Sequence, residues 1–316
     1  MHKIIVLNET GSATMGREYN AFISAICLAR MGNEVLYLGN SRFTNEFYEG
    51  GRTKDVDIFD LQPPSMPAML PASLDIMAFD QFDTAAFNTK TKERIDQFGR
   101  VDYVFHSGDS YMASFAQQIA ESRYAKVNSL DWGDMAPCVN ELALRHIDID
   151  TAVAGCRVFH IAERLSYAED IVPLKGLLAG HKGCQLWLLG YPSSDEPLDQ
   201  EALHSEDIYW QLPMTDSGRL KLLQTATIYI EPTRFMPNNQ AIAEALCLGI
   251  PVVVERNIHA ERLFGSFVEW LPDGLDRWFE PGAKEIGRGI ANRARQFFGF
   301  GERITYLHKL IKDTGC

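Results

Sequence analysis

The chain has 316 residues, of which 46% are hydrophobic and 23% are charged, a composition that excludes a mostly disordered or fibrous protein. Its 42 acidic and 30 basic side chains give a formal net charge of −12, which argues against binding nucleic acid or anionic membranes by overall charge. The length predicts one long domain or two short ones. No apolar run approaches the roughly 18 residues that a membrane-spanning helix needs. The N-terminal apolar run, Ile4–Leu7, is too short for a signal peptide.

The six cysteines are spread along the chain without a CxxC pair, so we expect neither a disulfide framework nor a zinc site. Reduced thiols are typical of the cytoplasm, and we expect a cytoplasmic protein. The cysteines are Cys27, Cys138, Cys156, Cys184, Cys247 and Cys316.

The first 40 residues predict a βαβ unit. Ile4–Leu7 is a short apolar run typical of a buried strand, and Thr10–Gly16 is a glycine-containing loop. Tyr19–Met31 has apolar residues at helical spacing, and Glu34–Gly39 predicts the next strand. A strand, a helix and a strand in this order favour a parallel sheet.

The remainder of the N-terminal half is less regular between residues 41 and 100, where Gln62–Pro71 carries four prolines and predicts a loop. Residues 135–155 have mixed character and are our candidate domain junction. Between these two regions we expect a strand at Val101–Phe105, a helix at Tyr111–Ser122 and a strand at Ala125–Leu130.

Strands and helices alternate again in the C-terminal half, which predicts a second parallel sheet. We expect strands at Arg157–Ala162, Gln185–Leu189, Ile208–Leu212, Thr227–Ile230 and Pro251–Val254, and helices at 168–180, Ser217–Thr225, Asn239–Leu248, Gly282–Phe297 and Gly301–Lys312. Gly249 stands where a helix C-cap glycine belongs.

The predicted fold class is therefore α/β, with two doubly wound, Rossmann-like domains and a cleft between them at the carboxyl ends of the strands. We expect an N-terminal domain over residues 1–150 and a ligand-binding domain over residues 151–285. Residues 286–316 are expected to form C-terminal helices that pack back toward the first domain.

The segment from residue 227 to residue 254 offers the clearest chemistry. A buried strand ends in a polar loop, and the first amides of the following helix, at Asn238, Asn239 and Gln240, suit a phosphate. Arg234 in the loop adds a bidentate donor, and Glu244 in the helix is placed to hold a ribose diol. The same pattern also fits ordinary helix caps and a solvated glutamate.

This segment resembles the donor-binding helix of retaining glycosyltransferases of the GT-B fold, a family that uses nucleotide sugars. The run Ala243–Val253 matches the second half of that motif, and the resemblance implies that Glu244 holds the nucleotide ribose. The first half is degenerate, because the position of the family's first glutamate falls on Met236, and Pro237, Asn238 and Asn239 replace its usual glycines.

Two other stretches resemble the same family. His160–Leu165 is similar to its Gly-Arg-Leu, which implies that Arg164 neutralises the donor diphosphate. The family's partner lysine falls on Glu169, a carboxylate that would repel a diphosphate, and Lys175 is the nearest substitute in sequence. Asp102–His106 resembles the family's Asp-Val-Val-His strand. The loop with Gly11 and Gly16 resembles its glycine-containing loop near the phosphates.

The resemblance implies a glycosyltransferase that moves a sugar from a nucleoside-diphosphate sugar, of UDP or GDP type, to an acceptor hydroxyl. We expect a retaining, metal-independent enzyme without a further cofactor, in which Arg164, Arg234 and the 238–240 amides stabilise the leaving diphosphate. His106 and Asp109, at the end of an N-domain strand, would orient the acceptor. A structural histidine with satisfied hydrogen bonds is an equal reading of His106.

Several alternatives stay open. One alternative is a non-catalytic GT-B-like protein that binds a nucleotide sugar or glycan. Another is an enzyme of the kind that glycosylates a modified base in phage-type DNA. The acceptor is accordingly a glycan, a small molecule or a modified base. Asp148 and Asp150 have the Asp-x-Asp spacing that metal-dependent glycosyltransferases of another fold use. Asp131 and Asp134 are candidates for the acceptor side or for a simple strand-end turn. Dehydrogenase, P-loop and hydrolase fingerprints do not occur in the sequence.

Overall fold

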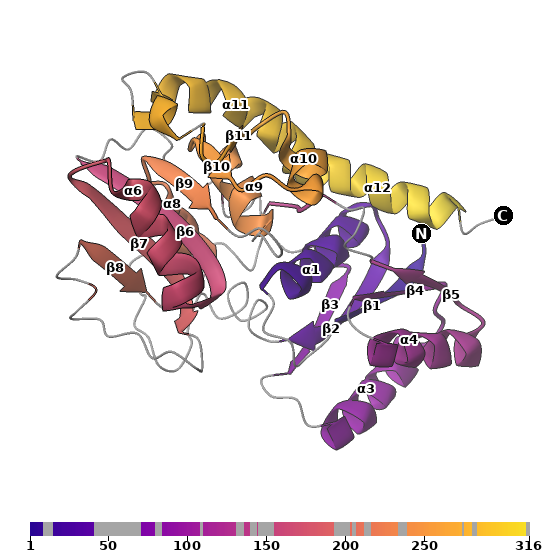
Figure 1. The fold of residues 1–316 in the computed structure, drawn as a ribbon. Coiled ribbons are helices and arrows are strands. Elements are labelled where there is room, and N and C mark those ends of the chain that lie inside the picture. Colours follow the sequence, from indigo (N-terminus) through magenta and orange to yellow (C-terminus); the bar gives the residue numbers. More distant parts are fainter. Residues whose placement is uncertain are drawn as a thin grey trace. The chain divides into compact units, whose positions relative to one another are not determined.

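The computed structural model describes residues 1–8, 15–40, 71–79, 84–107, 110–130, 136–139, 144, 155–192, 203, 207–211, 216–232, 239–273, 275–279 and 283–313. The chain divides into two compact units (Figure 1). Unit 1 contains Met1–Asn140 and Phe300–Cys316, and unit 2 contains Glu141–Gly299. The divisions thus lie at residues 140 and 299, where we expected 150 and 285.

Unit 1 is built on a five-stranded parallel sheet with the order β3-β2-β1-β4-β5. Parallel strands that helices cover on both faces are buried and therefore apolar along their whole length. Ile4–Leu7 is such a segment, and it is completely buried. The strands are β1 (Lys3–Asn8), β2 (Glu34–Asn40), β3 (Leu74–Phe79), β4 (Tyr103–Ser107) and β5 (Lys126–Ser129).

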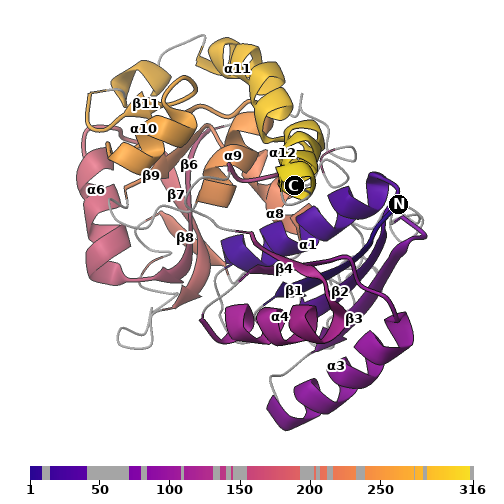
Figure 2. The ribbon, with the colours of Figure 1, turned by 90° about the vertical axis from the view of Figure 1, so that its right-hand side faces the viewer.

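Helices cover both faces of this sheet, with α1 on one face and α3 and α4 on the other (Figure 2). Ile5 and Leu7 of β1 pack with Ile95 of α3 and Met112 of α4. On the opposite face Phe22 of α1 meets the ring of Tyr37 edge-on, with centroids 5.1 Å apart. The helices are α1 (Met15–Arg30), α3 (Thr84–Phe98), α4 (Ser110–Arg123) and α12 (Phe300–Asp313).

Unit 2 is built on a six-stranded parallel sheet with the order β11-β10-β9-β6-β7-β8. The strands are β6 (Cys156–Leu165), β7 (Cys184–Pro192), β8 (Ile208–Gln211), β9 (Ile228–Glu231), β10 (Val252–Val254) and β11 (Glu269–Trp270). The two sheets confirm the predicted α/β class with two doubly wound domains.

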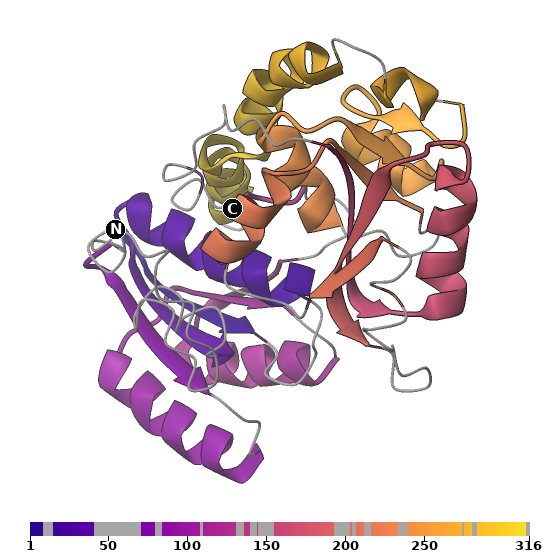
Figure 3. The ribbon, with the colours of Figure 1, turned by 90° about the vertical axis from the view of Figure 1, so that its left-hand side faces the viewer.

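The helices of unit 2 also lie on both faces of its sheet, with α6 on one side and α9 on the other (Figure 3). Leu174 of α6 packs against Val158 and Leu186 in the core of the α6 side. Gly249 ends α9 with φ +75°, and the N–H of Ile250 donates to the carbonyl of Ala245, as the C-cap prediction requires. The helices are the π-helical turn η3 (Tyr167–Ile171), α6 (Val172–Leu178), α8 (Asp216–Leu223), α9 (Asn239–Cys247), α10 (Ile258–Phe264), the 3-10 turn η4 (Asp276–Phe279) and α11 (Ala283–Phe298).

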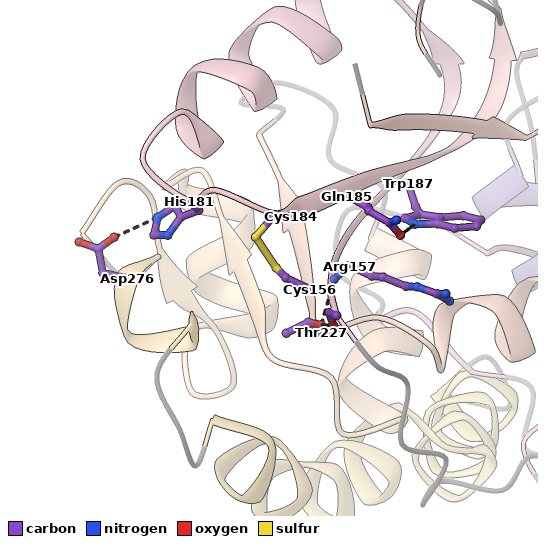
Figure 4. The surroundings of a disulfide bond; sticks show 9 residues. Cys156, Arg157, His181, Cys184, Gln185, Trp187, Thr227 and Asp276 are labelled. Carbon is purple, nitrogen blue, oxygen red and sulfur yellow. Dashed lines mark hydrogen bonds and ion pairs between the residues drawn. A yellow bond between two sulfur atoms is a disulfide. The ribbon is translucent and has the colours of Figure 1, made fainter. Parts of the chain in front are cut away.

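A disulfide joins Cys156 and Cys184, so our expectation of reduced thiols throughout was wrong (Figure 4). The two residues are register partners at the amino ends of β6 and β7, with Cα atoms 4.6 Å apart. Adjacent parallel strands bring them together although 28 residues separate them in sequence. Cys27, Cys138 and Cys247 are buried and form no disulfide bond. Among the helices that the structure describes, none is long and apolar enough to cross a membrane.

Candidate functional site

The strand order of unit 2 places a topological switch point between β6 and β9. From β6 the chain proceeds outward through β7 to β8, and from β9 it proceeds the other way through β10 to β11. Connections that leave two such strands in opposite directions open a crevice at their carboxyl ends, where α/β proteins bind ligands. Glu231 is the last residue of β9, and Arg164 is the penultimate residue of β6, so both stand at this switch point.

Helix α9 begins beside this switch point, at Asn239, eight residues after Glu231 ends β9. The first amides of a helix have no partner within the helix and carry its positive dipole end, which makes them suited to a phosphate. Asn239 and Gln240 are the first two residues of α9, as predicted. Arg234 and Asn238 lie outside the described residues, as does Met236.

Glu244 is completely buried in α9 and is bound on both carboxylate oxygens. Arg219 of α8 donates from Nη2 to Oε1 at 2.6 Å and from Nε to Oε2 at 2.9 Å. Gln240 donates from Nε2 to Oε1 at 3.1 Å. The alternative of a solvated glutamate is therefore wrong. The role of Glu244 at a ribose stays a prediction. A ribose hydroxyl would have to donate to the Glu244 carboxylate in addition to the three hydrogen bonds that this carboxylate already accepts.

A second group of buried polar side chains links β6, β9 and η3 at the switch point. His160 lies with Nδ1 3.1 Å from the carbonyl oxygen of Ile230, and Nε2 3.5 Å from Oδ1 of Asp170. Oε1 of Glu231 is 3.9 Å from the same Nδ1. Burial of the ring opposes its protonation, but the carboxylates of Glu231 and Asp170 and the carbonyl of Ile230 outweigh it and raise the pKa of His160.

The hydroxyl of Tyr229 contacts Glu231, and the charge of Glu244 also acts on it. This hydroxyl lies 3.2 Å from Oε2 of Glu231 and 3.4 Å from the carbonyl oxygen of Ile161. Burial, together with the charges of Glu231 and Glu244, raises the pKa of the Tyr229 phenol well above its usual value. Tyr229 is therefore a neutral hydrogen-bond donor near the carboxyl end of β9.

Sequence reasoning missed Arg219 and the His160–Asp170–Glu231 group. Arg219 is 25 residues from Glu244, and His160 is 70 residues from Ile230. No local spacing rule relates positions on different elements at such separations. The switch-point rule would have indicated the ends of β6 and β9, once the strand order was known.

The remaining predicted residues of unit 2 have these positions. Arg164 belongs to β6 and pairs in register with Tyr191, while its side chain lies outside the described part of the structure. Glu169 is exposed in η3, and its N–H donates to Oγ of Ser166 at 3.3 Å. Nζ of Lys175 lies 6.0 Å from the ring centroid of Tyr167.

Unit 1 has its own switch point, between β1 and β4. His106 is 8% exposed near the carboxyl end of β4, in register with Leu7 of β1. Asn8 ends β1 and donates from Nδ2 to the Tyr37 hydroxyl at 3.0 Å. Gly16 lies within the first turn of α1, where we expected it in the preceding loop. Asp109 and Gly11 lie outside the described residues, as do Asp131, Asp134, Asp148 and Asp150.

Comparison with known proteins identifies the fold. No protein-family model matches the chain, and no curated protein matches it in sequence. Among solved structures, HepE from Anabaena in complex with UDP and glucose matches with a TM-score of 0.62 and 13% identity over 99% of this chain and 100% of that one. The fold is that of the GT-B glycosyltransferases.

Two further GT-B structures match with similar coverage. Sucrose-phosphate synthase from Thermosynechococcus elongatus has a TM-score of 0.57 and 11% identity, over 99% of both chains. AviGT4, a glycosyltransferase involved in avilamycin A biosynthesis, has a TM-score of 0.59 and 14% identity, over 98% of this chain and 96% of its own. At these identities the comparison establishes the GT-B architecture over nearly the whole chain.

Proposed function

We propose that the chain is a glycosyltransferase that moves a sugar from a nucleoside-diphosphate sugar to an acceptor hydroxyl. The observation that carries this proposal is the amino end of α9 beside the β6/β9 switch point, in a GT-B fold. HepE, which has the same fold, was solved with UDP and glucose, and a UDP or GDP sugar is the donor class that we propose.

In this proposal the donor binds to unit 2. The amides of Asn238, Asn239 and Gln240 hold the diphosphate together with Arg164 and Arg234, and Glu244 holds the ribose. Backbone amides and basic side chains that stabilise the leaving diphosphate do the work of a metal ion, so we propose metal-independent transfer.

The residues of unit 1 complete the proposal. The loop with Gly11 and Gly16 lies near the phosphates of the donor, and His106 and Asp109 orient the acceptor. In a retaining reaction the bond between the anomeric carbon and the diphosphate oxygen breaks, and the acceptor oxygen bonds to the same face of that carbon. The acceptor proton passes to the leaving phosphate, so the protein supplies no strong base.

A thermal-shift series with UDP, GDP, ADP, CMP and dTDP, with and without Mg²⁺, tests the donor site. A ligand at 100 times its Kd adds about 2.7 kcal/mol to the stability of the folded protein, which raises the melting temperature measurably. We expect one diphosphate to stabilise the protein equally in EDTA and in Mg²⁺. Failure of every nucleotide to shift the melting temperature would refute the proposal.

Glu244→Gln tests the ribose contact, because it keeps the shape of the side chain and removes its charge. It also weakens the buried pair with Arg219, so binding is measured at a temperature where the variant is folded. We expect this variant to lower the ratio of the affinity for UDP to the affinity for 2′-deoxy-UDP. Glu302→Gln, at an exposed position of α12, should leave this ratio unchanged. Binding of UDP sugars without hydrolysis or transfer to any acceptor would support the non-catalytic alternative instead.

A further inference from the structure

Strand β6 carries one residue more than its neighbour β7 near their carboxyl ends. Ile161 is the register partner of Leu189, and Arg164 is the register partner of Tyr191. Between these two pairs β6 advances from position 161 to 164 while β7 advances only from 189 to 191, so the extra residue of β6 forms a β-bulge. Bulges are uncommon between parallel strands, and they re-aim the residues that follow them, often beside an active site.

The bulge changes which residues of β6 face the core on the α6 side of the sheet. Before the bulge, Val158 and Ala162 contribute to this core at even spacing. After it, Leu165 belongs to the same core, three residues past Ala162. Because successive residues of a strand lie on opposite faces, a regular β6 would have placed Arg164 in the position that Leu165 fills.

The residue of β7 opposite the bulge is Gly190, and only glycine fits there. Gly190 follows Leu188 by two residues, so it lies on the same α6 side of the sheet. A Cβ atom on Gly190 would lie 2.3 Å from the carbonyl oxygen of Ala162 and 3.0 Å from Cγ of Leu165. The carbonyl belongs to the backbone and cannot rotate away. Trp210 of β8 donates from Nε1 to the carbonyl oxygen of Gly190 at 2.9 Å, so β7 is held from its other side as well.

We propose that the bulge in β6, with Gly190 opposite it, positions Arg164 for the donor diphosphate. Arg164 directly precedes Leu165, so its place in the strand is on the other face of the sheet, the side on which α9 lies (Figure 3). A guanidinium on this side adds to the amides at the amino end of α9 as a donor to a phosphate. This inference rests on the proposed function and adds Gly190 to it as a positioning residue.

Calorimetric titration of the full chain with UDP, or with GDP where GDP is the diphosphate that stabilises the wild type, tests this inference. We expect Gly190→Ala to bind the diphosphate about tenfold more weakly than the wild type, the factor that loss of one charge-assisted hydrogen bond represents. Gly176→Ala is the matched control, because Gly176 is exposed on α6 and a Cβ atom there would meet nothing within 4 Å. It should bind the diphosphate like the wild type.

A double-mutant cycle with Arg164→Ala separates positioning from a general loss of structure. If Gly190 acts through Arg164, Gly190→Ala should weaken binding in the wild-type background and have little further effect once Arg164 is alanine. A change that merely loosened unit 2 would weaken binding by the same factor in both backgrounds.

Deletion of Glu163 tests the bulge itself. The deletion removes the extra residue of β6 and keeps the register on either side of it, so Ala162 becomes the single partner of Gly190. The methyl group of Gly190→Ala then has the room that a regular strand pair provides. We expect the deletion to restore diphosphate binding to Gly190→Ala. If Gly190→Ala alone does not fold, recovery of the folded state in the combined variant is the result that we expect.

The outcomes distinguish this inference from the proposed function. Wild-type affinity in Gly190→Ala, or an equal loss with and without the Arg164 side chain, would overturn the inference and leave the donor site standing. A Glu163 deletion that rescues neither the binding nor the folding of Gly190→Ala would overturn it as well. If the wild type binds no nucleoside diphosphate, the proposed function and the inference both fall.

Discussion

Glu244 is held by Arg219 through two hydrogen bonds inside unit 2, where neither residue is more than 6% exposed. Breaking a buried pair from one side leaves an uncompensated charge, which costs about 3–5 kcal/mol, whereas replacing both partners by apolar groups is often nearly neutral. We therefore expect Arg219→Met to lower the free energy of unfolding by about this amount. Arg219→Met combined with Glu244→Leu should recover most of it, as measured by urea denaturation at pH 7.

The control for this pair is an exposed one. Arg277 and Glu269 are joined at 2.6 Å with side chains 54% and 35% exposed, and such pairs contribute about 1 kcal/mol or less. Arg277→Met should thus change the stability only slightly. Additive losses in the double variant at Arg219 and Glu244 would contradict the argument, because they would show that the two side chains act independently.

Helix α11 crosses the end of α9 at a point where only glycine fits. A Cβ atom on Gly287 would lie 2.2 Å from the carbonyl oxygen of Gly249, whereas a Cβ atom on Gly289 in the same helix would meet nothing within 4 Å. We expect Gly287→Ala to destabilise the protein by about 1–3 kcal/mol, since the helix must move away. Gly289→Ala should stabilise it by up to about 1 kcal/mol through helix propensity.

Thermal or urea unfolding of the two glycine variants decides this point. Both changes add the same methyl group to the same helix, so propensity and the unfolded chain are matched between them. Equal effects of the two substitutions would show that the contact between α11 and the end of α9 does not constrain the helix.

Most elements were predictable because their signal is local. Strands such as Ile4–Leu7 and the one expected at Thr227–Ile230 are short, largely apolar runs, and α9 follows from a strand, a polar loop and a C-cap glycine. No comparable local signal marks β3 or α3. The segment Thr84–Phe98 is mostly polar, and among the side chains of α3 that the structure describes only Thr91 and Ile95 are buried.

Only the part of the candidate site that lies on a single helix, α9, was predictable from the sequence. Asn239, Gln240 and Glu244 lie within two turns of this helix, so their relative positions could be inferred from their spacing in the sequence. The partners that fix the electrostatics of the site come from other strands and helices. Arg219, Asp170 and Glu231 meet their partners only through the strand order, as Cys184 meets Cys156 only through register. Such contacts depend on topology rather than on period or propensity.

At the scale of the whole molecule, unit 1 is completed by the C-terminal end of the chain. Arg303 of α12 is 3% exposed and donates to Oγ of Ser24, Oδ1 of Asn20 and the carbonyl of Ala136, at 3.1, 2.7 and 2.9 Å. Asn20 also accepts from the N–H of Cys138. One guanidinium therefore joins α12, α1 and the segment at residues 136–138.

Because the partners of Arg303 given above all belong to unit 1, loss of its guanidinium should weaken this unit and spare the other. We expect Arg303→Met to lower the stability of unit 1 by about 3 kcal/mol or more, since it removes three hydrogen bonds inside this unit. Arg303→Lys should not restore this stability, because an ammonium lacks the planar fork that reaches three acceptors.

Hydrogen exchange read by mass spectrometry should show faster exchange in β1, α1 and β4 but not in β6, β7 and β9. Lys309→Ala, on an exposed position of α12, is the control that should leave both patterns unchanged. A uniform loss of protection across both sheets would mean that the two units unfold as one, and that α12 supports the whole chain rather than unit 1.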